Sequence, residues 1–265
     1  MADETLNEEQ KLAVEALIEL KRICDKHNLK LFLIAGTCLG AVRHKGMIPW
    51  DDDIDVGLLY DDWHKLRKIL PKELNGRFEY VDDEIENTWP RFFGKILYNR
   101  KSCVDIFLIA KWTDDPVSAR IHWSISKIAR DLYYKSINYH IPFVIRPEWS
   151  TLRRIRRCIT PAIKKILYFI PHFFFNRNDC IRLARWNDSF FEGKEANCYI
   201  NIYSVYSMNK ETLKSEWIEN VSQVEFEGES YNTVGDTDAY LTHLYGDYMT
   251  PPPAEKQVCV HGETF

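Results

Sequence analysis

Residues 34–58 of this 265-residue chain read IAGTCLGAVRHKGMIPWDDDIDVGL. The stretch overlaps an apolar run at 31–35 that is typical of a buried strand. We expect Gly36 and Thr37 to end that strand, and residues 37–43 to form a short helix with Thr37 as its N-cap. A glycine at this turn lets a phosphate approach the backbone, and the N–H groups that begin a helix point toward such an anion. The stretch therefore predicts a strand, a phosphate-binding turn and a helix.

Four aspartates follow within the same stretch, and Ile54 and Val56 lie among and after them. Because side chains alternate between the faces of a strand, we expect Asp51, Asp53 and Asp55 to share one face and Asp52 to point to the other. Carboxylates crowded on one face repel each other unless a cation lies between them. Carboxylate and phosphate oxygens are the ligands that Mg²⁺ prefers. A solvated acidic turn is the alternative, but the strand-forming residues favour a metal site for Mg²⁺, with Mn²⁺ as second choice.

Two further strands are expected at 91–98 and 103–109, as a hairpin around residues 99–102. Asp105 is embedded in the apolar second strand, where an acid is costly unless it is paired or bound to metal. An edge position facing water is the alternative. Lys95 in the first strand could hold a donor phosphate or pair with an aspartate across the strands, and both roles stay open.

Arg43, His44 and Lys45 lie between the predicted helix and the aspartates. Arginine can bind phosphate through two parallel hydrogen bonds, so these residues are expected to clamp a diphosphate. A solvated basic turn is the alternative, and His44 alone is a weak candidate for a general base.

Composition indicates a folded chain, because 45% of the residues are hydrophobic and 14% aromatic. The seven cysteines form no CxxC pair and no zinc-ligand spacing, which favours reduced thiols in the cytoplasm. The N-terminal sequence MADETLNEEQ does not resemble a signal peptide, and no apolar run reaches the ~20 residues that span a bilayer.

Charge is unevenly distributed: residues 146–185 contain ten Lys or Arg and two Asp or Glu, although the whole chain has a net charge of −4. Residues 151–170 are amphipathic, with basic residues opposite an apolar face and Pro161 as an expected kink. The segment 151–175 therefore predicts either a peripheral contact with the inner face of the cell membrane or a helix packed on the core. We expect no nucleic acid binding, because no basic-aromatic groove pattern appears outside this segment.

The rest of the chain alternates between helices and strands, without repeats or low-complexity linkers. We expect helices at 7–27, from Asp61 to the residue before Pro71, and at 119–139, 179–191 and 236–246; strands at 78–81 and 199–206; and strand and turn at 217–226.

A family resemblance is carried by the Gly36-Thr37 pair and the spaced Asp-x-Asp, which resemble the signature of the nucleotidyltransferase fold. The longer strings GTCLGAVRHKG at 36–46 and IPWDDDID at 48–55 closely resemble the LicD family. That family includes bacterial phosphocholine transferases and is related to the fukutin-type ribitol-phosphate transferases. The match extends to VDIF at 104–107, YGDYM at 245–249 and the prolines at 252–253, with little between about 110 and 197.

The resemblance implies an α/β (α+β) fold with a nucleotidyltransferase-like mixed sheet. Residues 1–112 would form the catalytic core, 113–195 a helical basic insertion, and 196–265 a C-terminal segment that completes the core and the donor site. It also implies that Asp105 faces Asp53 and Asp55 from a neighbouring strand. Two Mg²⁺ ions about 4 Å apart could then share this triad.

The activity implied is transfer of phosphocholine from CDP-choline to a hydroxyl of a cell-surface or lipid-linked glycan, such as a teichoic acid, capsule or lipopolysaccharide precursor, with release of CMP. Asp53, Asp55 and Asp105 would hold the metal, Asp51 would be a supporting ligand, and Asp105 is the first choice as general base. The C-terminal block would either close over the donor or lock the structure, and its candidate site residues are Tyr245, Asp247, Tyr248 and His261.

Three alternatives remain open. Glycerol- or ribitol-phosphate transfer from another CDP-alcohol would use the same carboxylates with a more polar pocket. An ordinary nucleotidyltransferase acting on a small molecule would share the Gly-Thr and Asp-x-Asp features. A non-catalytic membrane scaffold would use the basic segment alone.

Overall fold

The computed structural model describes residues 6–139, 150–152, 154–155, 159–161, 163 and 174–257. Its elements in chain order are α1 (Glu8–Lys26), β1 (Leu31–Leu33), α2 (Ala35–His44), β2 (Ile54–Leu59), α3 (Tyr60–Glu73), β3 (Glu79–Val81), β4 (Gly94–Tyr98), β5 (Lys101–Trp112), α4 (Pro116–Ser136), α7 (Arg177–Ser189), β6 (Cys198–Asn201), α8 (Met208–Glu211), β7 (Thr212–Lys214), α9 (Ser215–Glu219), β8 (Val221–Phe226), β9 (Glu229–Val234), α10 (Thr237–Tyr245) and η1 (Ala254–Lys256).

The strands of the described residues form one mixed sheet of nine strands. Its main path is β3-β4-β5-β2-β1-β9-β8, while β6 pairs with β5 and β7 with β6. β2 and β5 are parallel, and β4 is antiparallel to β5. The mixed sheet with its helices confirms the predicted α+β class, and strands from the C-terminal part of the chain join the same sheet.

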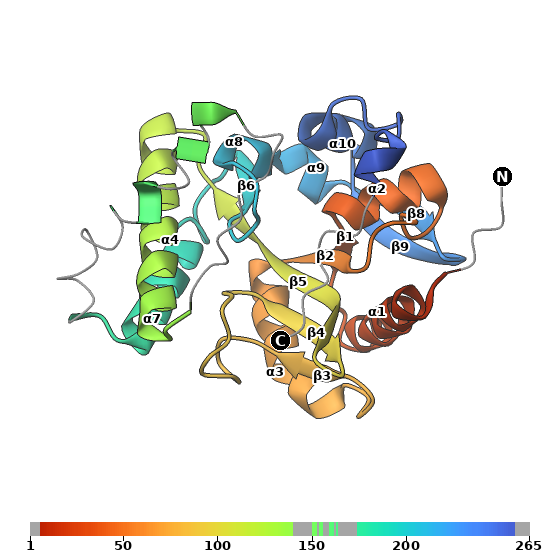
Figure 1. Cartoon of the computed structure of the whole chain (residues 1–265), viewed down its shortest axis with the longest axis horizontal. Helices are drawn as coiled ribbons and strands as arrows, with labels where there is room; N and C mark the ends of the chain where they lie inside the picture. The colour runs from red at the N-terminus through yellow and green to blue at the C-terminus, as the bar shows by residue number, and fades with distance from the viewer. Residues whose placement is uncertain are drawn as a thin grey trace.

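Helices cover the sheet and enclose a continuous apolar core (Figure 1). α1 begins at a capping box formed by Asn7 and Gln10, and its core-facing positions Ala13, Leu17 and Leu20 are fully buried. α3 is held to β5 by a hydrogen bond of 3.2 Å from the Trp63 indole N–H to the carbonyl of Ile106. α4 and α7 pack against each other at the left of Figure 1.

The helix expected to start at Thr37 starts earlier. α2 begins at Ala35, β1 already ends at Leu33, and Thr37 does not cap the helix. The Thr37 hydroxyl instead accepts a hydrogen bond of 2.7 Å from the backbone N–H of Asp55, so it ties α2 to β2. The N-cap prediction for Thr37 was wrong because a tertiary contact uses the hydroxyl group.

Several other boundaries differ from the expected ones. α3 continues through Pro71 to Glu73, where it was expected to stop before the proline. The expected strand-and-turn segment 217–226 begins inside α9, and only β8 is strand. The strand expected at 199–206 ends at Asn201. The hairpin between β4 and β5 is confirmed, and its turn residues Asn99 and Arg100 both have positive φ.

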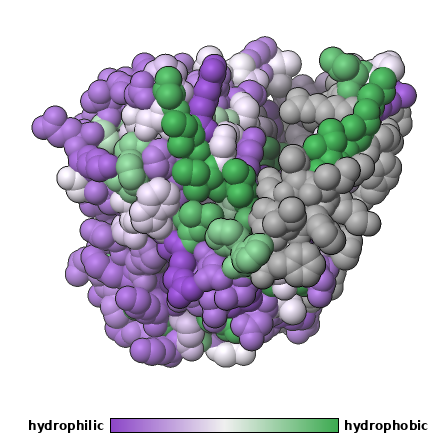
Figure 2. Space-filling model, turned by 90° about the vertical axis from the view of Figure 1, so that its left-hand side faces the viewer, coloured by the Kyte–Doolittle hydropathy of each residue, from purple (hydrophilic) through white to green (hydrophobic). Residues whose placement is uncertain are grey.

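Most of the basic segment 151–175 lies outside the described residues. Of those described, Leu152 is 77% exposed, and Ile155 and Ile159 are about half exposed. Figure 2 shows apolar side chains on the surface formed by α4, where Val117 and Ile121 are exposed. No helix in the described part of the chain is long and apolar enough to cross a membrane. Contact of this segment with a membrane surface stays a prediction.

Candidate active site

Three carboxylates converge where β2 and β5 lie side by side. The parallel register places Asp55 directly beside Asp105, and Asp53 immediately precedes β2. Each of the three offers an oxygen atom, and these atoms lie within 4.8 Å of one another. Asp53 and Asp105 are 8% and 5% exposed. Ile54, between Asp53 and Asp55, is fully buried on the other face. The expected convergence of these three residues is therefore what the structure shows.

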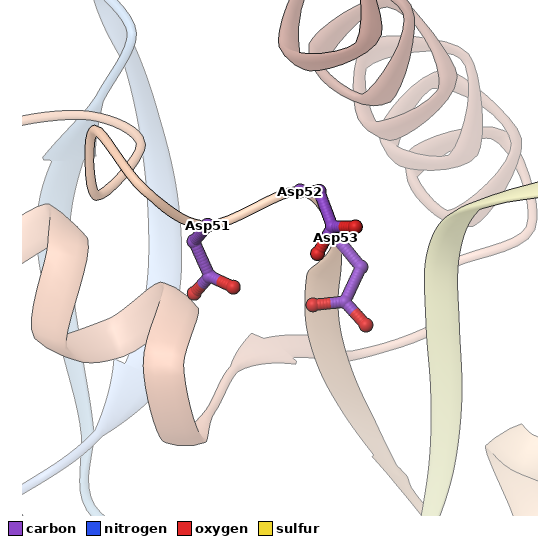
Figure 3. Close-up of side chains that lie close together, drawn as sticks. All are labelled: Asp51, Asp52 and Asp53. Atoms are coloured by element: carbon purple, nitrogen blue, oxygen red, sulfur yellow. The ribbon is translucent and has the colours of Figure 1, made fainter. Parts of the chain in front are cut away.

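A second group of carboxylates shares Asp53 with the first. Asp51, Asp52 and Asp53 also offer oxygen atoms within 4.8 Å of one another, and Figure 3 shows them along the loop that enters β2. The expectation that Asp52 would point away was wrong. Residues 51–53 precede the strand, and the Asp51 N–H donates to the carbonyl of Ile48 in a turn, so the alternation of a strand does not apply to them.

The donor set suits a hard divalent cation. Its atoms are carboxylate oxygens in two overlapping groups, which is the chemistry that Mg²⁺ and Mn²⁺ select. Close carboxylates also repel one another without a positive charge between them. The residues present therefore fit the metal that the sequence predicts.

Lys95 lies across from Asp105 in the register of β4 and β5. Its Nζ is 2.7 Å from Oδ1 of Asp105, and both side chains are almost fully buried. Ser102 joins the pair: its hydroxyl donates to the same Oδ1 at 2.9 Å and lies 3.1 Å from Nζ of Lys95. Of the two roles left open for Lys95, the structure shows the cross-strand ion pair, and phosphate binding stays a prediction.

Gln10 of α1 supports the loop that contains Asp51, Asp52 and Asp53, which we call the aspartate loop. Its side-chain amide, in a residue that is 4% exposed, donates to the carbonyls of Ile48 at 3.2 Å and Asp51 at 2.9 Å. Gln10 was not among the residues predicted from the sequence. Its signal is a polar side chain at a core-facing position of an amphipathic helix, one turn before Ala13.

A cavity of ≈ 1040 Å³ lies over the carboxylates. Its lining includes all four aspartates of the loop and strand, Asp105, Lys95, Gly36 at the start of α2, and Tyr245 from α10. A Cβ on Gly36 would lie 3.1 Å from Oδ2 of Asp51, so the glycine allows this carboxylate to approach the helix. The first turn of α2 and the carboxylates therefore face the same space.

Arg43, His44 and Lys45 lie at the opposite end of α2, roughly 12 Å along the helix from Gly36. The Arg43 guanidinium donates to the backbone carbonyl of Tyr248 at 2.8 Å and to Nε2 of His44 at 2.9 Å. None of the three is among the described residues that line the cavity. The structure thus connects Arg43 to the C-terminal segment and places the three residues outside the described lining of the cavity.

The candidate site residues of the C-terminal block do not lie together in the structure. Tyr245 lines the cavity, and burial raises its pKa well above the ordinary value. The Tyr248 hydroxyl donates to Asp238 at 2.6 Å, and Asp247 accepts from the hydroxyl of Thr250 at 2.7 Å. His261 lies outside the described residues. Only Tyr245 among the described members of this block reaches the site.

The cavity also contains residues that the sequence analysis missed. They come from the loop before β4, from α4 and its end, and from β6 and the loop after it: Arg91, Arg130, Tyr134, Tyr139, Asn201, Tyr203, Ser204 and Tyr206. No spacing in the sequence points to them, because three separate segments contribute.

Comparisons with known proteins agree with this geometry. The family model described as "LicD/FKTN/FKRP, nucleotidyltransferase domain" matches residues 28–123, which include the clustered aspartates and Lys95. The chain is 27% identical to the lipopolysaccharide cholinephosphotransferase LicD of Haemophilus influenzae, over 96% of this chain and 94% of the relative. Uncharacterised proteins of Rickettsia prowazekii and Rickettsia typhi are 38% and 30% identical, over 32% and 51% of this chain and 29% and 39% of their own lengths. Residues 28–123 therefore match a LicD-type nucleotidyltransferase domain, and the similarity along almost the whole chain supports a LicD family phosphotransferase.

Proposed function

We propose that this protein transfers phosphocholine from CDP-choline to a hydroxyl of a cell-surface glycan and releases CMP. The observation that carries the proposal is the buried cluster of Asp53, Asp55 and Asp105 in the wall of a large cavity. The full-length similarity to a protein named as a lipopolysaccharide cholinephosphotransferase supports the choice of donor and acceptor.

Asp53, Asp55 and Asp105 are the proposed metal ligands, with Asp51 in support. When bound, Mg²⁺ would neutralise the diphosphate charge and polarise the phosphorus for in-line attack. The donor diphosphate fits between these carboxylates and the start of α2, because Ala35 and Gly36 line the cavity there and the N-terminus of a helix favours phosphate.

The transfer makes one bond and breaks one. The acceptor oxygen bonds to the phosphorus that carries choline, and the bond from this phosphorus to the oxygen bridging the two phosphates breaks. CMP leaves with that oxygen and the bonding electron pair, and the hydroxyl proton passes to a carboxylate. Asp105 is our first choice for this base, because it faces Asp53 and Asp55 from a separate strand.

The quaternary ammonium group of choline would bind at the aromatic side chains near α2. The rings of Tyr206 and Tyr245 lie 6.3 Å apart, nearly perpendicular to each other, and both residues line the cavity. A cation is attracted to the face of such rings. A glycerol- or ribitol-phosphate donor would gain little from them, so the tyrosines favour choline.

The test is thermal unfolding with Mg²⁺ and, separately, CDP-choline, CDP-glycerol, CDP-ribitol, CTP and ATP. A ligand at about 100 times its Kd should add roughly 2.7 kcal/mol to the free energy of unfolding. We expect a Mg²⁺-dependent shift with CDP-choline that Asp53→Asn abolishes and Asp25→Asn, on the exposed face of α1, retains. A shift with CTP alone would support an ordinary nucleotidyltransferase. A shift with another CDP-alcohol would change the donor, and no shift with any nucleotide would support a scaffold.

The acceptor's cellular setting is also a proposal. A lipid-linked precursor of teichoic acid, capsule or lipopolysaccharide would bring the protein to the inner face of the cell membrane, where the basic segment 151–175 would meet anionic lipid. Co-sedimentation with anionic vesicles but not with neutral vesicles is the expected result.

A further inference from the structure

The cavity is larger than one small substrate requires. Its volume of ≈ 1040 Å³ slightly exceeds the range of roughly 300–1,000 Å³ that single-ligand pockets occupy. It extends from α2 and α10 on one side of β5 to α4 on the other, and Figure 1 shows these helices on opposite sides of that strand. The volume therefore has room for two substrates that meet at the carboxylates.

The part of the cavity beside α4 is chemically unlike the carboxylate centre. It is lined by two arginines and two tyrosines, Arg91, Arg130, Tyr134 and Tyr139, which we call the α4 arm. No carboxylate belongs to this group, whereas the centre of the cavity contains five. Positive side chains at one end and aspartates at the centre imply that the two regions bind groups of different charge.

The α4 arm is assembled from two segments of the chain. Arg130 and Tyr134 are four residues apart on α4 and therefore share one face of the helix. Arg91 comes from the loop before β4, and its guanidinium lies 6.0 Å from the centre of the Tyr139 ring. The rings of Tyr134 and Tyr139 are 5.1 Å apart and tilted by 55°. Two cationic groups and two aromatic faces are thus directed at one space.

Both arginines are close enough to affect Tyr134 electrostatically. Burial raises the pKa of the Tyr134 hydroxyl, and Arg91 and then Arg130 act in the opposite direction. Among the described residues, no carboxylate forms an ion pair with Arg130. A half-buried guanidinium in a cavity wall is well suited to bind an oxyanion through two hydrogen bonds.

We propose that the α4 arm binds the acceptor and selects a sugar that carries an anionic group, either a phosphate or a carboxylate. Arg91 and Arg130 bind the oxyanion, and Tyr134 and Tyr139 contact the apolar face of the sugar ring. This inference rests on the proposed function, because it assigns the acceptor to the same cavity. It adds a charge requirement that the activity alone does not contain.

The donor does not need the α4 arm. Its diphosphate is accounted for by the metal carboxylates and the start of α2, on the other side of β5. In-line transfer requires the attacking hydroxyl to approach opposite the leaving CMP. An acceptor in the α4 arm reaches the carboxylates from the side that the donor leaves open.

The experiment is isothermal titration of the protein, saturated with Mg²⁺ and CDP, with glucose 6-phosphate, glucuronate and methyl glucoside. We expect at least one anionic sugar to bind about tenfold or more tightly than methyl glucoside, which corresponds to about 1.4 kcal/mol, because hydrogen bonds to charged groups are stronger than those to neutral groups. Phosphate and carboxylate specificity are distinguished by which of the two anions binds more tightly. Equal binding of all three sugars by the unmodified protein would overturn the proposal, whatever the variants do.

Variants then locate the site. Arg130→Gln should remove most of the anion preference while leaving methyl glucoside and CDP-choline binding within about twofold, whereas Arg120→Gln, an exposed arginine on the same helix, should change neither. Arg130→Lys should retain part of the preference, since the charge remains. If Arg130→Gln weakens CDP-choline binding as strongly as sugar binding, the arm holds the donor and the proposal is wrong. Anion-selective sugar binding without any CDP-choline binding would refute the proposed function and leave the anion site standing.

Discussion

Lys95 and Asp105 form an ion pair of 2.7 Å in the wall of the cavity, with side-chain exposures of 5% and 8%. Two charges removed from water are stable only while each compensates the other. Asp105 is also a proposed metal ligand, so a bound cation and the lysine would share the task of balancing its charge. Stability and the proposed metal binding would therefore be coupled at this residue.

Lys95→Met should lower the free energy of unfolding in EDTA by roughly 3–5 kcal/mol, since it leaves Asp105 buried without its partner. Mg²⁺ should restore part of that loss, and should stabilise the variant more than the unmodified protein. Urea unfolding with and without Mg²⁺ measures both effects. Lys65→Met, which removes an exposed ion pair with Asp62, is the control and should change stability by less than about 1 kcal/mol. A Lys95 variant that behaves like this control would contradict the prediction.

Glu211 is a buried carboxyl group that accepts a hydrogen bond from Ser204 in the cavity wall. Burial raises its pKa from 4.5 to about 7. The pKa of Glu211 is higher in the folded state than in the unfolded state. Its contribution to the free energy of unfolding is therefore present below about pH 4.5 and is lost as the pH rises through about 7.

Glu211→Gln should remove this pH dependence, which amounts to roughly 3 kcal/mol between pH 4.5 and 8. In denaturant unfolding at both pH values, the stability of the variant minus that of the unmodified protein should be higher at pH 8 than at pH 4.5. The exposed Glu216→Gln is the matched control and should leave the pH dependence unchanged. Parallel pH profiles of the Glu211 variant and the unmodified protein would show that the carboxyl is not buried in solution.

At the scale of elements, α1 positions a loop to which it is not adjacent in sequence. Gln10 in its first turn donates to the carbonyls of Ile48, Pro49 and Asp51, and these bonds set the backbone from which the aspartates project. On the other side of the loop, Thr37 of α2 binds the backbone of Asp55. Two helices thus fix the geometry of the proposed metal ligands without supplying any.

Gln10→Met keeps the size of the side chain but removes its two N–H donors. We expect a loss of about 1–3 kcal/mol in stability, because buried carbonyls lose their partner, together with weaker Mg²⁺ binding. Isothermal titration with Mg²⁺ separates the positioning effect from stability alone. Gln223→Met, on the exposed face of β8, should affect neither quantity. Unchanged Mg²⁺ affinity in the Gln10 variant would show that the loop holds its shape unaided.

For the whole molecule, a buried charge network joins the layer of α4 and α7 to the rest of the fold. Asp83 is fully buried and accepts from Arg67 of α3 at 3.0 Å and from Arg185 of α7 at 2.6 Å. Arg185 also reaches Asp188 at 3.2 Å. Since α4 supplies Arg130 and Tyr134 and packs on α7, this network holds the α4 arm in place relative to the carboxylates.

Arg185→Met should destabilise the protein by about 3–5 kcal/mol, because Asp83 and Asp188 lose a buried partner. If the network also orients the α4 arm, sugar binding should weaken more than CDP-choline binding at a temperature where the variant is folded. Arg182→Met, one turn away and 76% exposed, is the control for removing a charge from α7. A stability loss no larger than that of the control would refute a structural role for the network.

Part of the candidate site could be predicted from the sequence: local signals pick out the acids, and the family resemblance implies that Asp105 faces Asp53 and Asp55. The alternation of acids with Ile54 and Val56 indicates a strand edge, and the apolar surroundings of Asp105 indicate an acid that needs a partner. The helices and the β4–β5 hairpin follow from equally local periodicity and turn residues, whereas the mixed sheet is what the family resemblance implies. Asp52 departs from its expected direction because the strand begins only at Ile54, a boundary set by pairing with β1 and β5.

Contacts between distant segments lay beyond what the chain's local pattern can predict. Lys95 faces Asp105 only through the register of β4 and β5, and Gln10 meets the aspartate loop 38 to 41 residues away. Arg43 and His44 come shortly before the aspartate loop in the sequence, yet they lie in the last turn of α2, at the opposite end of this helix from Gly36. The α4 arm has no sequence signature at all, because α4 must first pack beside the loop before β4 for Arg91 and Arg130 to share a cavity. Residue type and periodicity thus specify which chemistry is available, and the packing of separate elements specifies which of those groups meet.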